Sequence, residues 1–452
     1  MITSSAWRGK RYAVLGLARS GLATVDALVA SGADVFAWDS NEAAIEKLFP
    51  GEGRGPDLQS GTLSLDPGLR RGKVEIGNPL EIDLAGFAGV AVSPGVPLNS
   101  HPIAAKAAEA GVPIIGDIEL FAEARAEMPA HRVVGITGTN GKSTTTALIH
   151  HIIETAGIPA RLGGNIGLPV LGQDPLPEGG VYVLELSSYQ IDLTHSLDCD
   201  VAVLLNITPD HLDRYAGFEA YAASKARLFA MQSKGHAAVI GIGDEPSAAI
   251  ARQVADAGRS EDLTRIAPGI CMDQSRWPAL QGPHNAQNAL AAIAACQALG
   301  IEQAAIDKGL ETFPGLPHRM ERVKTVNGVL FVNDSKATNA DSTAPALSAY
   351  PKIHWILGGK AKTDDLDACR PGFPHVVKAY TIGDAGEMFA QLLEGEMPVE
   401  RAGTLDVAVR AAAANAQPGE VVLLSPACAS FDQFKDYEAR GQAFRDAVEA
   451  LG

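Results

Sequence analysis

Short apolar segments alternate with amphipathic ones along most of the chain, and this alternation predicts an α/β protein. Near the N-terminus, residues 12–16 are apolar, residues 22–31 have helical spacing, and residues 35–39 form a second apolar segment that ends in an acid. Apolar segments this short, each followed by a polar or glycine-rich turn, are typical of parallel strands buried on both faces. The order strand, helix, strand predicts a Rossmann-like unit at the start of the chain.

The same alternation continues to the C-terminus. Further strands are predicted at 89–92, 132–137, 181–185, 201–206, 329–334, 353–359 and 421–425, and an alanine-rich helix at 288–299. Because 452 residues exceed what one hydrophobic core supports, we expect several domains. We predict a Rossmann-like N-terminal domain (1–116), a central domain of the phosphate-loop type with a mainly parallel sheet (117–315), and a C-terminal Rossmann-like α/β domain (316–452). We make no prediction for residues 252–281.

Composition narrows the class of partner and the compartment. The formal net charge of −16 argues against nucleic acid or an anionic membrane as the main partner. The five cysteines are odd in number and lack C-x-x-C spacing, which favours a reducing compartment over a disulfide framework. The N-terminus lacks the apolar core of a signal peptide, and no window reaches the length of a membrane span. We therefore expect a cytoplasmic, monomeric protein that acts on small molecules.

One motif carries the strongest chemical signal. A glycine-rich turn lies between the strand at 132–137 and a helix, so its N–H groups and the helix N-terminus can bind phosphate. Lys142 adds a full charge, and the Ser143 hydroxyl can ligate the accompanying Mg²⁺. The strict phosphate-loop spacing requires glycine where Ile136 stands. The turn nevertheless predicts nucleoside triphosphate binding, with the candidate ATP-binding residues Gly138, Thr139, Asn140, Gly141, Lys142, Ser143 and Thr144.

Other polar residues follow the predicted strands, where open α/β sheets place their sites. Glu185 ends one strand and is either a Mg²⁺ ligand or an acid near a helix N-terminus. His211 follows another strand and is either a second metal ligand or a packed or capping residue. Lys225 lies on the next helix, where a lysine is ordinarily exposed to solvent. In the first turn Ala18 replaces a glycine of the dinucleotide fingerprint, so a phosphate or nucleotide group is favoured over a nicotinamide dinucleotide.

Several longer motifs resemble those of the Mur ligase family of peptidoglycan synthesis. They are Gly-Thr-Asn-Gly-Lys-Ser at 138–143, Glu-Leu-Ser-Ser-Tyr-Gln at 185–190, Asp-His-Leu-Asp-Arg-Tyr at 210–215, Asn-Asp-Ser-Lys-Ala-Thr-Asn at 333–339 and Leu-Ser-Pro-Ala-Cys-Ala-Ser-Phe-Asp-Gln-Phe-Lys at 424–435. The similarity runs in order and spacing from about residue 11 to the C-terminus. The last motif resembles the branch of the family that adds D-glutamate.

The resemblance implies a specific reaction. ATP phosphorylates the carboxylate of UDP-N-acetylmuramoyl-L-alanine, and the amine of D-glutamate then attacks the acyl phosphate, which yields an amide, ADP and phosphate. Bringing a carboxylate and a polyphosphate together requires cations. The resemblance implies ATP as co-substrate and two Mg²⁺ sites. One is formed by Ser143 and Glu185 and the other by His211 and a carbamylated Lys225, and the residues placed at the chemistry are Lys142, Glu185, His211 and Lys225.

The resemblance also assigns binding residues. For the UDP-linked substrate it implies Arg19, Ser20, Asp39, Ser40, Ser93, Gly95, Asn165, Ser187 and His211. For ATP it adds Asn285 and Asn288, and, when the domains close, Arg319, Asp334 and Lys336. For D-glutamate it implies Lys336, Thr338, Lys362, Ser430 and Tyr437. Asn285 and Asn288 are three residues apart, which places both amides on one helix face.

The chain departs from the family pattern at three positions. Asn41 stands where an arginine beside uracil is familiar, Tyr437 replaces a phenylalanine, and Lys360 can compete with Lys362 for a substrate carboxylate.

Other functions stay open. The alternatives are a sister ligase that adds another amino acid, a folylpolyglutamate-type synthetase, and a regulatory nucleotide-binding protein without ligase chemistry. A dehydrogenase is disfavoured by Ala18.

Overall fold

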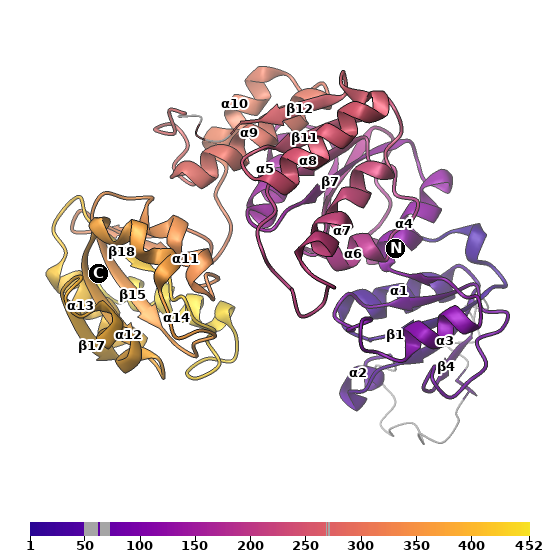
Figure 1. Cartoon of the computed structure of the whole chain (residues 1–452), viewed down its shortest axis with the longest axis horizontal. Helices are drawn as coiled ribbons and strands as arrows, with labels where there is room; N and C mark the ends of the chain where they lie inside the picture. Colours follow the sequence, from indigo (N-terminus) through magenta and orange to yellow (C-terminus); the bar gives the residue numbers. More distant parts are fainter. Residues whose placement is uncertain (49–61, 64–72, 268, 270–271) are drawn as a thin grey trace. The chain divides into compact units, whose positions relative to one another are not determined.

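The computed structural model describes residues 1–48, 62–63, 73–267, 269 and 272–452. They form two compact units, Met1–Pro268 with Leu290–Ile306 and Gly269–Ala289 with Asp307–Gly452. The first unit contains two six-stranded sheets and the second contains one (Figure 1). The predicted α/β class is therefore confirmed, whereas the domain boundaries at 116 and 315 stay predictions.

The first sheet has the strand order β3-β4-β2-β1-β5-β6 and is parallel except for the pairing of β3 with β4. Its strands are β1 (Arg11–Leu15), β2 (Asp34–Trp38), β3 (Thr62–Leu63), β4 (Val74–Ile76), β5 (Gly89–Val92) and β6 (Ile114–Ile115). The accompanying helices are η1 (Ser5–Trp7), α1 (Arg19–Ala30), α2 (Glu42–Glu46) and α3 (Ile103–Glu109). β1 pairs with β2 and β5, so the turn after β1 lies at the centre of the sheet edge.

The second sheet is parallel throughout, in the order β12-β11-β10-β7-β9-β8. Its strands are β7 (His131–Thr137), β8 (Ala160–Gly164), β9 (Gly180–Glu185), β10 (Val201–Leu204), β11 (Ala237–Gly241) and β12 (Leu263–Ile266). Its helices are α4 (Asp117–Ala124), η2 (Arg125–Glu127), α5 (Lys142–Thr155), η3 (Val170–Gly172), α6 (Ser188–Asp192), α7 (Phe218–Ala230), α8 (Glu245–Val254) and the π-helical turn η4 (Ala255–Arg259). Because β7 lies between β9 and β10, the polar residues that follow these three strands meet at one edge.

The third sheet, in the second unit, has the order β13-β14-β18-β15-β16-β17 and one antiparallel pair, β13 with β14. Its strands are β13 (Glu321–Val326), β14 (Val329–Asn333), β15 (Ile353–Gly358), β16 (Val376–Ile382), β17 (Val399–Gly403) and β18 (Val421–Leu424). Its helices are α11 (Ala340–Leu347), η5 (Asp367–His375), α12 (Gly386–Leu393), α13 (Leu405–Asn415) and α14 (Tyr437–Glu449). Trp355 and Ile356 alternate between two apolar clusters, as expected for a sheet buried on both faces.

Two helices begin earlier than the sequence pattern predicts. α1 begins at Arg19 rather than at residue 22, and its first turn closes when the N–H of Leu22 donates to the carbonyl of Ala18. α9 (Pro283–Ala298) begins at Pro283, because proline suits a first helical position, where no N–H is needed. α9 and α10 (Gln303–Thr312) each pass from one unit into the other. The apolar spacing alone could not reveal these first turns, because polar residues form them.

Two expectations from composition can be compared with the structure. The cysteines at 199, 296, 369 and 428 are buried and free, whereas Cys271 lies outside the described residues. Within the described ranges, no helix has the length and apolar character needed to cross a membrane.

The close packing of α1 against the first turn can be tested at Gly21. A Cβ at this position would lie 1.8 Å from the carbonyl oxygen of Gly16, so Gly21→Ala must displace the turn. We expect the substitution to lower the free energy of unfolding by roughly 1–3 kcal/mol, measured by urea denaturation. Gly172→Ala is the control, because its Cβ would make an ordinary contact at 3.4 Å with Ala23. Equal losses in both variants would contradict the argument.

Candidate active site

The glycine-rich turn after β7 has the shape that a phosphate loop requires. Gly138 (φ 150°) and Gly141 (φ 86°) adopt backbone conformations that other residues rarely accept, and α5 begins directly after them. The N–H of Thr139 donates to the carbonyl of Asn206 (2.9 Å), and the N–H of Asn140 donates to Oδ1 of Asn206 (2.8 Å). The segment after β10 therefore fixes the shape of the turn after β7.

Two lysine side chains converge on this turn. Nζ of Lys142 donates to the carbonyls of Gly138 (3.0 Å) and Thr139 (2.9 Å), and Nζ of Lys225 donates to the same Gly138 oxygen (2.9 Å). Lys225 is 1% exposed and lies 4.6 Å from the centroid of the Tyr221 ring. The expectation of a solvent-exposed Lys225 is wrong, because α7 directs this side chain at the phosphate turn.

The environment of Lys225 disfavours its charged form. Burial, and next the charge of Lys142, lower its pKa from 10.5 to about 7, although Asp210 and Asp192 oppose the shift. A large fraction of this amine is therefore neutral near pH 7. A neutral amine has a lone pair and can act as a nucleophile, which an ordinary surface lysine rarely does at this pH.

Glu185 ends β9 beside the phosphate turn and is 1% exposed. Its Oε1 accepts a hydrogen bond from Nδ2 of Asn165 (2.8 Å), whereas its Oε2 is buried without a hydrogen-bond partner. Ser187 is the N-cap of α6, so Glu185 lies two residues before the cap and near the helix N-terminus, as the alternative interpretation of this acid also expects. A buried carboxylate oxygen without a partner is costly, so this atom is suited to a cation. Ser143, the second residue of α5, is also buried.

His211 lies in the irregular segment between β10 and α7, with a side chain that is 48% exposed. Its Nε2 is 3.4 Å from Oδ2 of Asp210. Partial burial lowers the pKa of His211, and Lys142 and Lys225 lower it further, although Asp210 raises it. A neutral imidazole retains the lone pair that a metal ligand needs.

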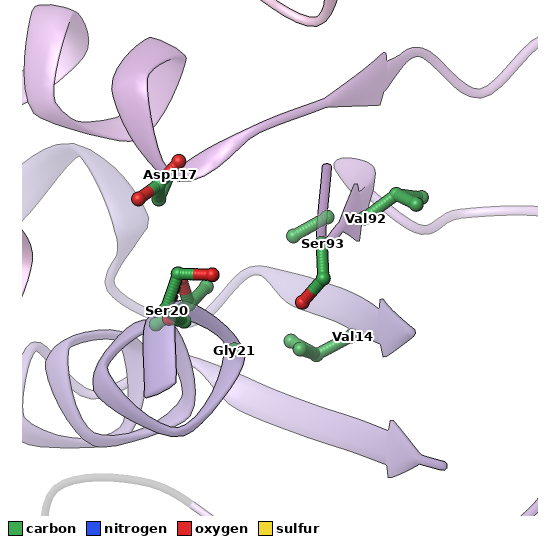
Figure 2. A pocket seen from close by; sticks show the side chains of 8 residues that line it. Val14, Ser20, Gly21, Val92, Ser93 and Asp117 are labelled. Atoms are coloured by element: carbon green, nitrogen blue, oxygen red, sulfur yellow. Dashed lines mark hydrogen bonds between the residues drawn. The ribbon is translucent and has the colours of Figure 1, made fainter. Parts of the chain in front are cut away.

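The N-terminal site centres on a small pocket (Figure 2). Its lining residues are Val14, Ser20, Gly21, Thr24, Ala91, Val92, Ser93 and Asp117. Figure 2 shows Asp117, the first residue of α4, opposite Ser20 of α1. Asp117 is 5% exposed, its Oδ1 accepts a hydrogen bond from the N–H of Ile118 (3.1 Å), and burial raises its pKa to about 6. The pocket thus combines hydroxyl groups with an acid that is partly protonated near neutral pH.

The other residues predicted for the UDP-linked substrate lie outside the lining of this pocket, and some of them stabilise the backbone. Both carboxylate oxygens of Asp39 accept backbone N–H groups, Oδ2 from Leu17 (2.6 Å) and Oδ1 from Asn41 (2.8 Å). Asn41 is the N-cap of α2, which gives this departure from the family pattern a local role. The exposed residues of the set are Arg19, Ser40, Gly95 and Asn165, and Ser187 forms a capping box with Gln190.

The second unit has its own polar edge, at the carboxyl ends of β14, β15 and β18. Asp334 is buried and accepts hydrogen bonds from Oγ of Ser425 (2.8 Å) and from the N–H of Met320 (3.1 Å). Burial raises the pKa of Asp334 to about 7, although these hydrogen bonds oppose the shift. The carboxyl group of Asp334 is therefore partly protonated near neutral pH.

Four of the residues predicted for D-glutamate lie in loops along this edge, and Tyr437 is the first residue of α14. Nζ of Lys336 is 5.2 Å from the centroid of the Tyr437 ring, Ser430 is buried, Thr338 is half-buried and Lys362 is exposed. Lys360 forms a β-bridge with Ala429, which ties two of these loops together.

Among the residues predicted for ATP in the second unit, two asparagines are in direct contact. Nδ2 of Asn288 donates to Oδ1 of Asn285 (3.1 Å), and both side chains are buried. The prediction that the two amides share a helix face is therefore confirmed. Arg319 is half-buried and belongs to the turn between α10 and β13.

Some residues at these edges were not predicted from the sequence. Asn206 shapes the phosphate turn, Tyr221 lies under Lys225, Asp117 lines the N-terminal pocket, and Arg214 contacts the loop after β5. Asn206 had a detectable signal, because it is a polar residue at the end of an apolar strand. The roles of the others depend on contacts between segments far apart in the sequence.

Two family models and several named relatives match this chain. The model of the Mur ligase middle domain matches residues 136–264, and the model described as Mur ligase, glutamate ligase domain matches residues 318–428. The chain is 62% identical to a protein of Novosphingobium aromaticivorans, over 100% of this chain and 97% of that protein. It is 62% identical to a protein of Sphingopyxis alaskensis and 57% identical to one of Zymomonas mobilis, in each case over 100% of both chains. All three relatives are named UDP-N-acetylmuramoylalanine–D-glutamate ligase.

Solved structures share the fold at lower identity. A UDP-N-acetylmuramate–alanine ligase of Thermotoga maritima matches with a TM-score of 0.57 at 16% identity, over 98% of this chain and 100% of that one. A pseudomurein peptide ligase of type C from Methanothermus fervidus matches with a TM-score of 0.54 at 18% identity, over the same shares. At these identities the likeness concerns the fold alone.

The raised pKa of Asp117 predicts a pH-dependent stability difference. Between pH 3.8 and about 6 the folded state keeps a proton that the unfolded state has released, so stability falls as pH rises through this window. Over roughly 2 pH units this amounts to up to about 3 kcal/mol. We expect Asp117→Asn to gain stability relative to wild type between pH 4 and pH 7, measured by urea denaturation. Asp34→Asn, at an exposed aspartate, is the control, and a pH-independent difference for Asp117→Asn would contradict the argument.

Proposed function

Because this chain belongs to the Mur ligase family, we propose that it joins D-glutamate to UDP-N-acetylmuramoyl-L-alanine at the expense of ATP. It is an ATP-dependent ligase of peptidoglycan synthesis that acts on small-molecule substrates in the cytoplasm. A sister ligase for another amino acid is not favoured, because the full-length relatives at 57–62% identity are named for D-glutamate. The likeness to sister ligases among solved structures is one of fold only.

The observation that carries the proposal is the convergence of Lys142 and Lys225 on the carbonyl of Gly138, at the same sheet edge as the unpartnered Oε2 of Glu185. The first chemical step must bring a carboxylate against the γ-phosphate of ATP, and both groups are anions. Positive charge arranged in advance at this point lowers the barrier more effectively than an acid or a base could. The phosphate turn supplies Lys142 and oriented N–H groups for this purpose.

The reaction balances in two displacements. A carboxylate oxygen of the muramoyl-alanine substrate attacks the γ-phosphorus, the bond to the ADP oxygen breaks, and an acyl phosphate forms. The amine of D-glutamate then attacks the acyl carbon, the carbon–oxygen bond to phosphate breaks, and the amine loses a proton. The released phosphate therefore retains one oxygen of the original carboxylate.

The residues at the central edge fit Mg²⁺, and we propose two ions. Glu185 with Ser143 would hold one, because Oε2 of Glu185 is buried and lacks a hydrogen-bond partner. His211 and a carbamylated Lys225 would hold the other. Among the described residues no cluster of three His, Cys, Asp or Glu side chains could hold a metal, and Mg²⁺ commonly takes waters and phosphate oxygens beside one or two protein ligands. Bound Mg²⁺ would neutralise phosphate charge.

Carbamylation would turn Lys225 into an oxygen ligand. The neutral amine of Lys225 attacks CO₂, a nitrogen–carbon bond forms, and one proton is released, which leaves a carbamate with two oxygen atoms. The lowered pKa supports this step, because a protonated amine has no lone pair. The modification also replaces the repulsion between Lys225 and Lys142 with attraction.

The remaining assignments follow the chemistry of the ligands. The N-terminal domain (1–116) would bind the UDP-linked substrate, the central domain (117–315) ATP, and the C-terminal domain (316–452) D-glutamate. The two carboxylates of D-glutamate suit Lys336 and Lys362, with hydroxyl groups from Thr338, Ser430 and Tyr437. The ATP contacts would include Asn285, Asn288, Arg319, Asp334 and Lys336, and the substrate contacts Arg19, Ser20, Asp39, Ser40, Ser93, Gly95, Asn165, Ser187 and His211.

Phosphate release measures the proposed reaction directly. Purified protein with ATP and Mg²⁺ should release phosphate only when UDP-N-acetylmuramoyl-L-alanine and D-glutamate are both present, and L-glutamate should not replace the D-isomer. With ¹⁸O in the donor carboxylate, one labelled oxygen should appear in the phosphate. Unlabelled phosphate would exclude the acyl phosphate, and equal turnover without the amino acid would exclude ligase function.

Lys225→Ala should reduce turnover roughly 100-fold or more, because it removes a proposed Mg²⁺ ligand and with it the charge stabilisation that this ion would supply. Acetate or another small carboxylic acid should restore part of the activity. Wild-type protein in ¹³C-labelled bicarbonate should show a carbamate signal by NMR that Lys225→Ala lacks. Lys234→Ala, at an exposed lysine, is the control and should keep both activity and signal. A carbamate signal that persists in Lys225→Ala would contradict the assignment.

A further inference from the structure

Two loops far apart in the sequence meet beside the proposed reaction centre. The segment 205–217, between β10 and α7, carries His211, and the segment 93–99, after β5, carries Ser93 and Gly95. The guanidinium of Arg214 donates to the carbonyl of Val96 (2.8 Å) and, more weakly, to that of Gly95 (3.5 Å). Nδ2 of Asn99 returns a hydrogen bond to the carbonyl of Asp213 (3.0 Å).

The same guanidinium also contacts the surroundings of His211. Its carbon lies 4.5 Å from the centroid of the Tyr189 ring, and the Tyr189 ring lies 5.1 Å from that of His211. The N–H of Arg214 donates to the carbonyl of His211 (2.9 Å), which closes a turn of the backbone. The side chain of Arg214 therefore links the loop that follows β5 to Tyr189, the aromatic neighbour of His211, while its backbone N–H holds the carbonyl of His211.

The backbone of His211 needs such support. Its φ of 54° lies in the left-handed region, which is unfavourable for a residue other than glycine. Such a conformation persists only where surrounding contacts determine it. The planar fork of Arg214 can stack on Tyr189 with one face and donate to two carbonyls with its edge, which a lysine ammonium cannot do.

We propose that Arg214 is a positioning residue that couples occupation of the N-terminal substrate site to the orientation of His211. The inference rests on the proposed function, in which Ser93 and Gly95 contact the UDP-linked substrate. A substrate that orders the loop after β5 also orders the two carbonyls that accept hydrogen bonds from Arg214. A fixed position of Arg214 in turn favours the backbone conformation of His211. Coupling between two sites is reciprocal, so a ligand at His211 also strengthens binding at the N-terminal site.

Other contacts join the N-terminal region to the central sheet away from this point. The N–H of Ile2 donates to the carbonyl of Leu171 (2.9 Å), that of Gly116 to Leu193 (2.9 Å), and Glu127 accepts from the N–H of Ser5 (2.7 Å). Loss of Arg214 should therefore leave the fold of the first unit intact. A variant that keeps its fold but loses part of the response of His211 would show that Arg214 positions His211 and is not needed merely for folding.

Hydrogen exchange of the full-length protein tests the coupling. Saturating UDP-N-acetylmuramoyl-L-alanine, without nucleotide, should slow amide exchange of the wild type in residues 16–22 and 93–96 and also in 207–216. In Arg214→Ala and Arg214→Lys the first two segments should still respond as in the wild type, whereas the response of 207–216 should be smaller, because only the direct contact of His211 with the substrate remains. We expect kcat to fall about 10–100-fold, as for residues that orient a ligand, with a change of only a few-fold in KM for D-glutamate.

A matched arginine provides the control. Arg132 also donates from its guanidinium to a backbone carbonyl, that of Leu299 (2.5 Å), but it lies at the opposite end of β7 from the phosphate turn. Arg132→Ala should keep the response of residues 207–216. A wild-type response of this segment in Arg214→Ala, or wild-type kcat in Arg214→Lys, would overturn the inference. If the wild type itself neither responds to the substrate nor turns over, the proposed function fails instead.

Discussion

Two lysine ammonium groups cannot share one carbonyl oxygen without mutual repulsion, and the central site depends on this constraint. Lys142 and Lys225 both donate to Gly138, and the second is almost wholly removed from water. Burial and the neighbouring charge together favour a neutral Lys225. The same arrangement that concentrates positive potential for a phosphate therefore also produces a reactive amine. In the proposed enzyme that amine becomes an oxygen ligand.

The parallel sheet creates this arrangement by placing three strand ends together. β7 provides the phosphate turn, β9 provides Glu185, and the segment after β10 provides Asn206 and then His211. Because the strands are buried along their length, polar side chains can collect only where the strands end. The unpartnered oxygen of Glu185 and the strained backbone of His211 are costs of that concentration, and such costs are typical of sites that bind charged ligands.

In each unit, burial shifts the pKa of one ionisable side chain toward 7, but the two side chains differ in kind. In the first unit a buried amine has a lowered pKa, whereas in the second a buried acid, Asp334, has a raised one. Both shifts have burial as their largest cause, and both bring a group close to neutrality near pH 7. Burial also raises the pKa of Asp117 in the N-terminal pocket.

The sequence by itself determined the α/β class, the phosphate turn, the strand ends that carry Glu185 and His211, and the shared helix face of Asn285 and Asn288. These features depend on residues close together in the chain, where apolar spacing and turn chemistry act locally. Only the tertiary structure decided that Lys225 is buried and that Arg214 contacts the loop after β5. Those outcomes depend on which distant segments pack together, and the sequence of a single helix or loop does not specify the segments that pack against it.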